Sequence, residues 1–153
     1  FNYKANELQN HQISIMTIEI LRLLIDFGLL VLIWSVQRII YPGFLHYSAN
    51  ELVKWHRIYT SRLTFIVLPL MFGQLAVSIY QMILKANFYS VMSFIIVVLL
   101  WLSTFLQFVP LHSKISQGEV SQKILNSLVK KNWIRTILWT VLFLLSLLFA
   151  TIL

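Results

Sequence analysis

The sequence predicts an all-α integral membrane protein, a four-helix bundle with short interfacial helices on its cytoplasmic side. Of its 153 residues, 59% are hydrophobic and only 11% are charged, whereas soluble domains carry about 25% charged residues. The sequence lacks the sustained alternation of apolar and polar residues that the strands of a membrane barrel would show. Four apolar stretches are long enough for helices to cross a bilayer, which takes roughly 20 residues each. They form one domain over residues 1–153, with spans at about 18–40, 63–84, 88–109 and 133–153.

The basic residues predict how these spans are oriented. Nine Lys and Arg residues lie in or beside the segments 41–62 and 110–132, against only Lys4 and Lys85 on the other side, with Arg22 inside the first span. The positive-inside rule therefore places both long loops in the cytoplasm and both termini outside, in the inner (cytoplasmic) membrane of the cell. The net charge of +7 is spread over these two loops. It favours contact with the anionic headgroups of the lipid bilayer and argues against a nucleic-acid partner.

Each long loop contains a Ser-x-x-Glu sequence, Ser48 to Glu51 and Ser116 to Glu119. This pattern is typical of a capping box at a helix N-terminus. The first is expected to start a helix near Ala49 that can run into the second span. The second is expected to start a helix that lies on the membrane surface before the fourth span. The apolar face of that surface helix would consist of Val120, Ile124, Leu125 and Leu128.

Polar residues recur at helical spacing along each span. Because lipid offers them no hydrogen-bond partners, the four polar stripes are predicted to face one another inside the bundle. For the neutral residues, simple helix–helix hydrogen bonding is the main alternative to a functional role. In chain order the stripes are Glu19, Arg22, Asp26 and Gln37; His56, Gln74, Ser78 and Gln81; Ser93, Thr104 and Gln107; and Asn132, Arg135, Thr136, Trp139 and Ser146.

Three charged residues lie together inside the first span. Glu19, Arg22 and Asp26 share one helix face in its outer part. Charges within a span are costly and are usually paired or functional. Two interpretations stay open for this intramembrane charge group: a self-neutralised patch near the outer interface, or a relay for protons or cations.

A second group of polar residues is predicted near the cytoplasmic end. We expect His56 and Arg135 to converge in one pocket, with His112 at its rim and His46 outside it. An arginine beside histidines and amides suits an anionic headgroup, a carboxylate, or a phenolate or quinone oxygen. The candidate ligand-binding residues are His56, Gln107, His112, Asn132, Arg135 and Trp139.

Metal and cofactor chemistry receive little support from the sequence. The chain has no cysteine, which excludes thiolate nucleophiles and Cys-ligated metal. His56 and His112 lack a clear third ligand, so no metal site is predicted. Haem between two helices needs histidines at matching positions, and no regular histidine spacing supports it. The identity of any cofactor stays open.

Several short motifs resemble those of a family of small, uncharacterised bacterial four-span membrane proteins. They are Tyr41-Pro42, His56 to Tyr59, Pro69 to Met71, Pro110 to His112, and Asn132 to Thr136. The resemblance covers about residues 30–140. That family is distantly similar to the anthrone-oxygenase-like group, which implies oxidation of an aromatic substrate.

Three functions are compatible with the sequence. The first is a binding or accessory subunit whose cytoplasmic-side pocket takes an amphipathic ligand or lipid headgroup, within a larger membrane complex or a homo-oligomer. The alternative is a membrane oxidoreductase acting on a quinone-like or phenolic substrate, with a histidine as proton acceptor and Arg135 stabilising an oxyanion. The third, a proton-coupled carrier, requires the two polar groups to communicate.

Overall fold

The computed structural model describes residues 2–152, without the side chains at positions 2, 5, 8, 11 and 152. This part of the chain is helical almost throughout and contains no strand. In chain order its elements are α1 (Asn2–Ser35), the π-helical segment η1 (Val36–Ile40), α2 (Tyr41–Gly43), the 3-10 segment η2 (Phe44–His46), α3 (Ala49–Leu84), α4 (Phe88–Ser103), the π-helical segment η3 (Thr104–Phe108), α5 (Val109–Ser116) and α6 (Gln122–Ile152).

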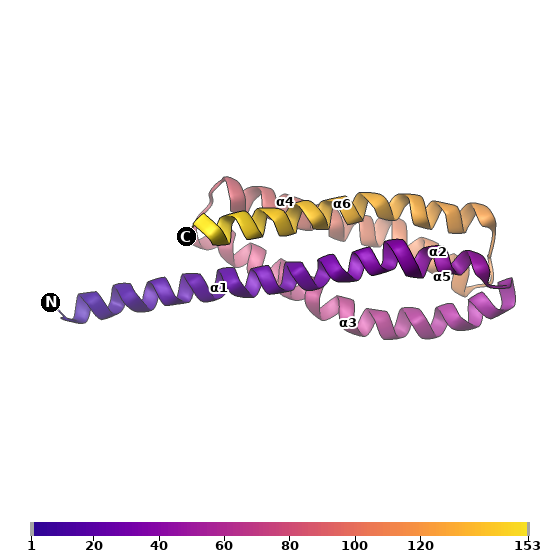
Figure 1. Ribbon diagram of the computed structural model, residues 1–153, viewed down its shortest axis with the longest axis horizontal. Helices are drawn as coiled ribbons and strands as arrows, with labels where there is room; N and C mark the ends of the chain where they lie inside the picture. The colour runs from indigo at the N-terminus through magenta and orange to yellow at the C-terminus, as the bar shows by residue number, and fades with distance from the viewer. Residues whose placement is uncertain (1, 153) are drawn as a thin grey trace.

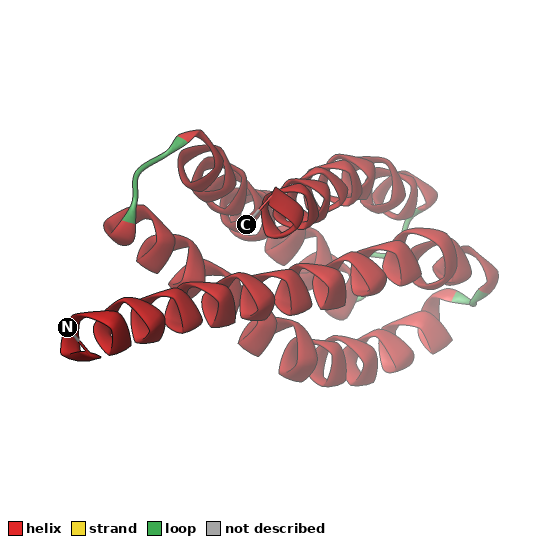
Figure 2. Ribbon diagram, turned by 60° about the vertical axis from the view of Figure 1, so that its left-hand side comes forward, coloured by secondary structure: helices red, strands yellow, loops and turns green. Residues whose placement is uncertain are grey.

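The long helices pack side by side into a bundle. Helix α1 lies against α3 and α6, and α4 lies against the same two helices (Figures 1 and 2). The N-terminal part of α1 projects beyond the ends of the other helices (Figure 1). The predicted all-α fold is therefore confirmed for the described residues.

Three helices are long and apolar enough to cross a membrane: Ala49–Leu84, Phe88–Ser116 and Gln122–Thr151. These three helices indicate a multi-pass membrane protein. Helix α1 has 34 residues, but the stretch predicted as its span carries Glu19, Arg22 and Asp26, and α1 is not among the three.

Two prolines coincide with a local widening of the helix. The π-helical segments η1 and η3 each end two residues before a proline, Pro42 and Pro110. A proline cannot donate to the carbonyl four residues earlier, and its ring clashes with that carbonyl. In both segments the next N–H bonds five residues back, from Tyr41 to Val36 and from Val109 to Thr104. Such π-bulges re-aim side chains and are frequent at functional sites.

The first predicted cap is present in the structure. Ser48 is the N-cap of α3, and its hydroxyl oxygen accepts a hydrogen bond from the backbone N–H of Glu51. The Ser48 hydroxyl in turn donates to the Glu51 carboxylate at 2.6 Å. Helix α3 then runs from Ala49 to Leu84, through Pro69, as predicted.

The second predicted cap is wrong. Ser116 is the last residue of α5, and Gly118 follows it with φ +95°. The N–H groups of Gly118 and Glu119 bond back to the carbonyls of Ile115 and Lys114. This is a Schellman motif, in which glycine takes the left-handed position that ends a helix. The Ser-x-x-Glu sequence therefore belongs to a helix end.

The predicted surface helix is also wrong. Ile124, Leu125 and Leu128 lie in the first turns of α6, which runs without interruption from Gln122, and Val120 precedes that helix. Leu125 and Leu128 are buried against Phe44 and Leu52 in the apolar core at this end of the bundle. The helical spacing of these apolar residues does define one helix face, but that face packs against the rest of the protein and not on the membrane surface.

Gly118→Ala should lower the free energy of unfolding by about 1–2 kcal/mol, the cost of placing a Cβ in the left-handed region. Nothing lies within 4 Å of the added Cβ, so the effect isolates the backbone. Gly43→Ala is the matched control, because Gly43 is equally unobstructed but has φ −58°. It should be neutral or slightly stabilising. Reversible unfolding in mixed detergent measures both, and equal effects would contradict the Schellman assignment.

Candidate functional site

A buried ion pair forms the centre of the first polar cluster. Arg22 Nε donates to Asp26 Oδ2 at 2.7 Å, one helical turn away, and both side chains are fully buried. Arg22 Nη1 also donates to Ser78 Oγ and Gln81 Oε1 of α3, at 2.6 and 3.2 Å. Gln74 Nε2 donates to Asp26 Oδ1 at 2.6 Å. The charge group of α1 is thus tied directly to α3.

Helix α6 and the remaining carboxylate complete this cluster. Ser146 of α6 donates to Asp26, and Trp139 Nε1 donates to Gln74 Oε1 at 3.3 Å. Gln81 Nε2 donates to both Glu19 oxygens at 3.0 Å. Arg22 Nη2 is the one buried donor of the cluster's charged side chains without a partner among the described residues. Asp26 compensates the charge of Arg22, and Gln81 satisfies the second carboxylate, so the self-neutralised interpretation is supported for the Arg22–Asp26 pair.

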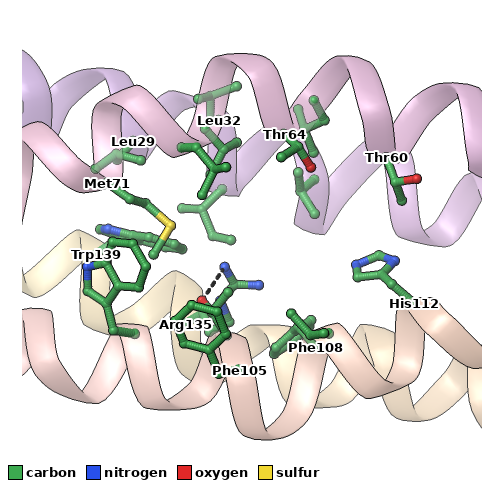
Figure 3. Close-up of a pocket in the computed structure, with 18 of the residues that line it drawn as sticks. Leu29, Leu32, Thr60, Thr64, Met71, Phe105, Phe108, His112, Arg135 and Trp139 are labelled. Atoms are coloured by element: carbon green, nitrogen blue, oxygen red, sulfur yellow. Dashed lines mark hydrogen bonds between the residues drawn. The ribbon is translucent and has the colours of Figure 1, made fainter.

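The second cluster surrounds a cavity of about 360 Å³. Figure 3 shows Leu29, Met71 and Trp139 at one end of it, Arg135 in the middle and His112 at the other end. Its lining side chains are mostly apolar and come from α1, η1, α2, α3, α6 and the continuous helix Phe88–Ser116. Four lining residues are exposed, and all come from α3 or from the segment η3–α5. The cavity therefore opens sideways between these helices, at Thr64, Leu68, Phe105 and Val109.

Arg135 is the only charged residue that lines this cavity among the described residues. Its side chain is 7% exposed, and its guanidinium carbon lies 4.2 Å from the ring centroid of Phe108 and 4.9 Å from that of Trp139. One weak hydrogen bond, 3.4 Å long, runs from Nη2 to Thr104 Oγ1 (Figure 3). Within the described residues Arg22–Asp26 is the only ion pair, so Arg135 has no carboxylate counter-ion there.

Three buried hydrogen-bond donors around the cavity lack partners among the described residues. They are Tyr59 Oη, Trp101 Nε1 and Arg135 Nε, from three different helices. Buried polar groups in folded proteins are nearly always hydrogen-bonded, and each unsatisfied donor costs about 1–3 kcal/mol. Three donors on one cavity therefore mark a place for a group rich in lone pairs.

A chain of hydrogen bonds leads from the cavity toward the end of α5. Tyr41 Oη lies 3.0 Å from His112 Nε2, and both residues line the cavity. His112 Nδ1 lies 2.7 Å from His56 Nε2, and His56 Nδ1 lies 3.0 Å from Ser116 Oγ. Four titratable or hydroxyl groups are thus linked in series.

Tyr41 is a neutral donor in this chain. Burial raises the pKa of Tyr41 to about 12, although the nearby Arg135 charge acts in the opposite direction. The phenol therefore keeps its proton at neutral pH. The Tyr41 ring packs against Phe44 and stacks on Phe108, which fixes the hydroxyl beside His112.

The structure brings only some of the predicted site residues to the cavity. His112, Arg135 and Trp139 line it. His56 lies behind His112 and does not line it, so the predicted direct convergence of His56 and Arg135 is wrong. His46 is exposed on η2, outside the cavity as expected.

The two predicted amides do not line the cavity. Asn132 Nδ2 donates to Gln37 Oε1 at 2.9 Å, so Asn132 joins α6 to η1. Gln107 is half-buried on η3. Asn132 is buried, but helical spacing alone could not separate a helix-packing amide from one that faces a cavity.

Sequence reasoning missed four residues of the site. Tyr41, Tyr59 and Ser116 were assigned to motifs or caps, and Phe108 was read as part of an apolar span. The usable signal was their proximity in sequence to the two prolines and two histidines. The π-bulges that aim Phe108 and Tyr41 are visible only in the structure.

Among the described residues, no group of three or more His, Asp or Glu side chains could hold a metal ion. Comparisons with protein-family models, curated proteins and solved structures find no match for this chain. The family resemblance noted from the motifs stays a prediction, and the site is interpreted from its own geometry.

The ion pair of the first cluster leads to a test of stability. Asp26→Leu and Arg22→Met should each destabilise the protein by about 3–5 kcal/mol, because each leaves a buried charge without its partner. The double variant removes both charges and should be less destabilising than the sum of the two single changes. Unfolding in mixed detergent measures the cycle. Strict additivity would show that the two charges do not interact.

Proposed function

We propose that this chain is a membrane-embedded binding protein whose cavity takes a small amphipathic anion. The polar group of the ligand, a carboxylate, a phenolate or quinone oxygen, or a lipid headgroup, would bind at Arg135. The observation that carries this proposal is the set of unpartnered donors around Arg135, a buried guanidinium with no carboxylate counter-ion among the described residues.

The two buried arginines support this proposal by their difference. Arg22 has Asp26 at 2.7 Å, whereas the Arg135 guanidinium lies over two aromatic rings and near the hydroxyls of Thr104 and Tyr41, with no carboxylate partner among the described residues. Cation–π contacts contribute about 0.5–2 kcal/mol, less than the cost of an uncompensated buried charge. An anionic ligand would supply the missing charge and accept from Arg135, on a cavity that Tyr59 and Trp101 also line.

The apolar wall of the cavity suits the hydrocarbon part of such a ligand. The side chains that line the cavity from Arg135 toward Leu29 and Met71 are mostly apolar. The cavity opens sideways between the helices. In a bilayer this opening would face the acyl chains. An amphipathic molecule could then enter from the membrane, and its charged end would reach Arg135 in the last step. The volume of about 360 Å³ lies within the usual range of small-molecule sites.

A second candidate is the membrane oxidoreductase acting on a quinone-like or phenolic substrate. The hydrogen bonds from Tyr41 through His112 to His56 favour it, because they supply a proton acceptor beside the cationic Arg135. A positioned base and a stabilised oxyanion are the usual requirements for deprotonating such a substrate. The motif resemblance to anthrone-oxygenase-like proteins points the same way.

The proposed function includes an orientation in the membrane. We place α1 as a fourth span, with its charges inside the bundle, and both termini outside the bacterial inner membrane. The cavity and the histidines then lie toward the cytoplasmic side. An accessory role in a larger complex or a homo-oligomer is compatible with this arrangement.

An alkaline phosphatase reporter tests the orientation. Fused after Leu153, it should be active, because the nine-to-two distribution of basic residues keeps the C-terminus outside. Fused after Tyr47, in the first predicted cytoplasmic loop, it should be inactive. The reverse activities would place the cavity at the outer side.

Ligand binding tests the role of Arg135. Radiolabelled laurate should bind the full-length protein in phosphatidylcholine nanodiscs, and Arg135→Gln should weaken binding by about 30-fold or more. That change corresponds to the loss of about 2 kcal/mol or more from one buried charge pair. Arg38→Gln, which removes an equal charge from an exposed position, should leave binding unchanged.

Competition with a second lipid distinguishes between the possible ligands. If phosphatidylglycerol in the nanodisc displaces laurate, the cavity accepts a lipid headgroup, whereas no displacement favours a free carboxylate or a phenolic ligand. Equal laurate binding by the wild type and Arg135→Gln would contradict the proposed function.

A further inference from the structure

The four linked groups of the second cluster connect the cavity to the end of a helix. Tyr41 lines the cavity and is buried, and His56 is fully buried between its two partners. Ser116 is half-buried at the C-terminus of α5, next to the exposed residues Gln117 and Gly118. The three links measure 3.0, 2.7 and 3.0 Å, all within hydrogen-bond range.

Both middle members of this chain are imidazoles that use both ring nitrogens. In a neutral imidazole one nitrogen donates and the other accepts. The 2.7 Å contact between His112 Nδ1 and His56 Nε2 requires that one of these two nitrogens carry no proton. Each ring can therefore accept a proton on one side while releasing one on the other. A purely structural histidine needs only one such bond.

We propose that Tyr41, His112, His56 and Ser116 form a proton relay that removes a proton from an acidic hydroxyl bound in the cavity. The ligand class is an amphipathic phenol, which enters neutral from the membrane and is held as its phenolate at Arg135. This inference deepens the proposed function and rests on it.

In each transfer one proton enters the relay from the phenol and one proton leaves it to water. At the start Tyr41 donates to His112 Nε2, His112 Nδ1–H donates to His56 Nε2, and His56 Nδ1–H donates to Ser116 Oγ. The phenol O–H bond breaks and its proton passes to Tyr41 Oη. Each following group accepts one proton and releases its own, and Ser116 passes the last proton to water. The phenolate keeps the bonding electron pair, no redox change occurs, and both imidazoles end as the opposite tautomers.

The surrounding charges favour transfer over storage of the proton. The charged and titratable groups facing the histidines are Arg135 on α6, Tyr59 and Arg57 on α3, and Tyr41 on α2. Arg57 donates to the backbone carbonyl of Ser116 at 2.8 Å and holds the exit residue in place. Both nearby charges are positive. A proton resting on either histidine is therefore repelled, whereas a phenolate beside Arg135 is stabilised.

The experiment follows the colour of a phenol bound to the full-length protein in nanodiscs. The probe is an alkyl-substituted 4-nitrophenol, whose phenolate is yellow. Equilibrium titration gives its affinity, and a stopped-flow pH jump gives the rate at which the bound probe changes colour. His56→Gln is the main variant, because glutamine can donate and accept but cannot exchange tautomers. Ser116→Ala is the second, and His46→Gln, at an exposed histidine outside the chain, is the control.

The relay predicts unchanged binding and slower transfer. His56→Gln should keep the affinity of the probe within about twofold while the rate falls by about 100-fold, within the range of general acid–base contributions. Ser116→Ala should also slow the rate, and His46→Gln should leave it unchanged. If His56→Gln fails to fold, a slowed rate in Ser116→Ala still supports the relay.

Two outcomes overturn the relay. One is a wild-type rate in His56→Gln. The other is loss of probe binding or of folding in His56→Gln together with a wild-type rate in Ser116→Ala, which assigns His56 a structural role. In both cases the probe still binds the wild type at Arg135, and the proposed function stands. A probe that does not bind the wild type while laurate does overturns the phenol ligand alone. Failure of both ligands to bind overturns the proposed function as well.

Discussion

The buried ion pair between Arg22 and Asp26 is the interaction on which the bundle depends. A charged residue among apolar helices is tolerated only if other protein groups satisfy it. Asp26 accepts from Arg22, from Gln74 of α3 and from Ser146 of α6, so one carboxylate joins three helices. Because these hydrogen bonds are directional, they set the rotation and depth of the helices in a way that interchangeable leucine contacts cannot. The same three helices also line the cavity farther along the bundle.

The two buried arginines differ in how their charges are satisfied. Around Arg22 nearly all donors and acceptors find partners within the described residues, and the charge is compensated. Around Arg135 the cation has aromatic faces, one weak hydrogen bond and a cavity, and three donors are left without partners. Folding tolerates such an arrangement where the rest of the structure is strong enough to impose it. Trp139 links the two regions, since it donates to Gln74 of the first cluster while its ring covers Arg135 in the second.

The sequence predicted the long helices, but neither all of their ends nor how they meet. Apolar length predicted the long helices, and helical spacing placed Arg22, Asp26, His56 and Arg135 in the interior, where the structure finds them buried. The Ser116 assignment failed because Ser-x-x-Glu fits both a helix start and the residues around a glycine-ended helix, and only φ at Gly118 distinguishes the two. His56 was expected at the cavity, but η1 and η3 bring Tyr41, Phe108 and His112 between it and Arg135. These bulges depend on how each proline is accommodated, which residue spacing does not encode.

Anion binding at Arg135 is tested most directly by a structure of the protein with a terminally brominated fatty acid. The carboxylate is expected to lie within hydrogen-bond distance of Arg135 Nε and Tyr59 Oη, with the bromine in the apolar part of the cavity near Leu29 and Met71. Arg22 and Asp26 are expected to remain paired as before. A carboxylate bound outside the cavity, or an Arg135 whose guanidinium has turned away from Phe108 and Trp139 toward the membrane surface, would contradict the account.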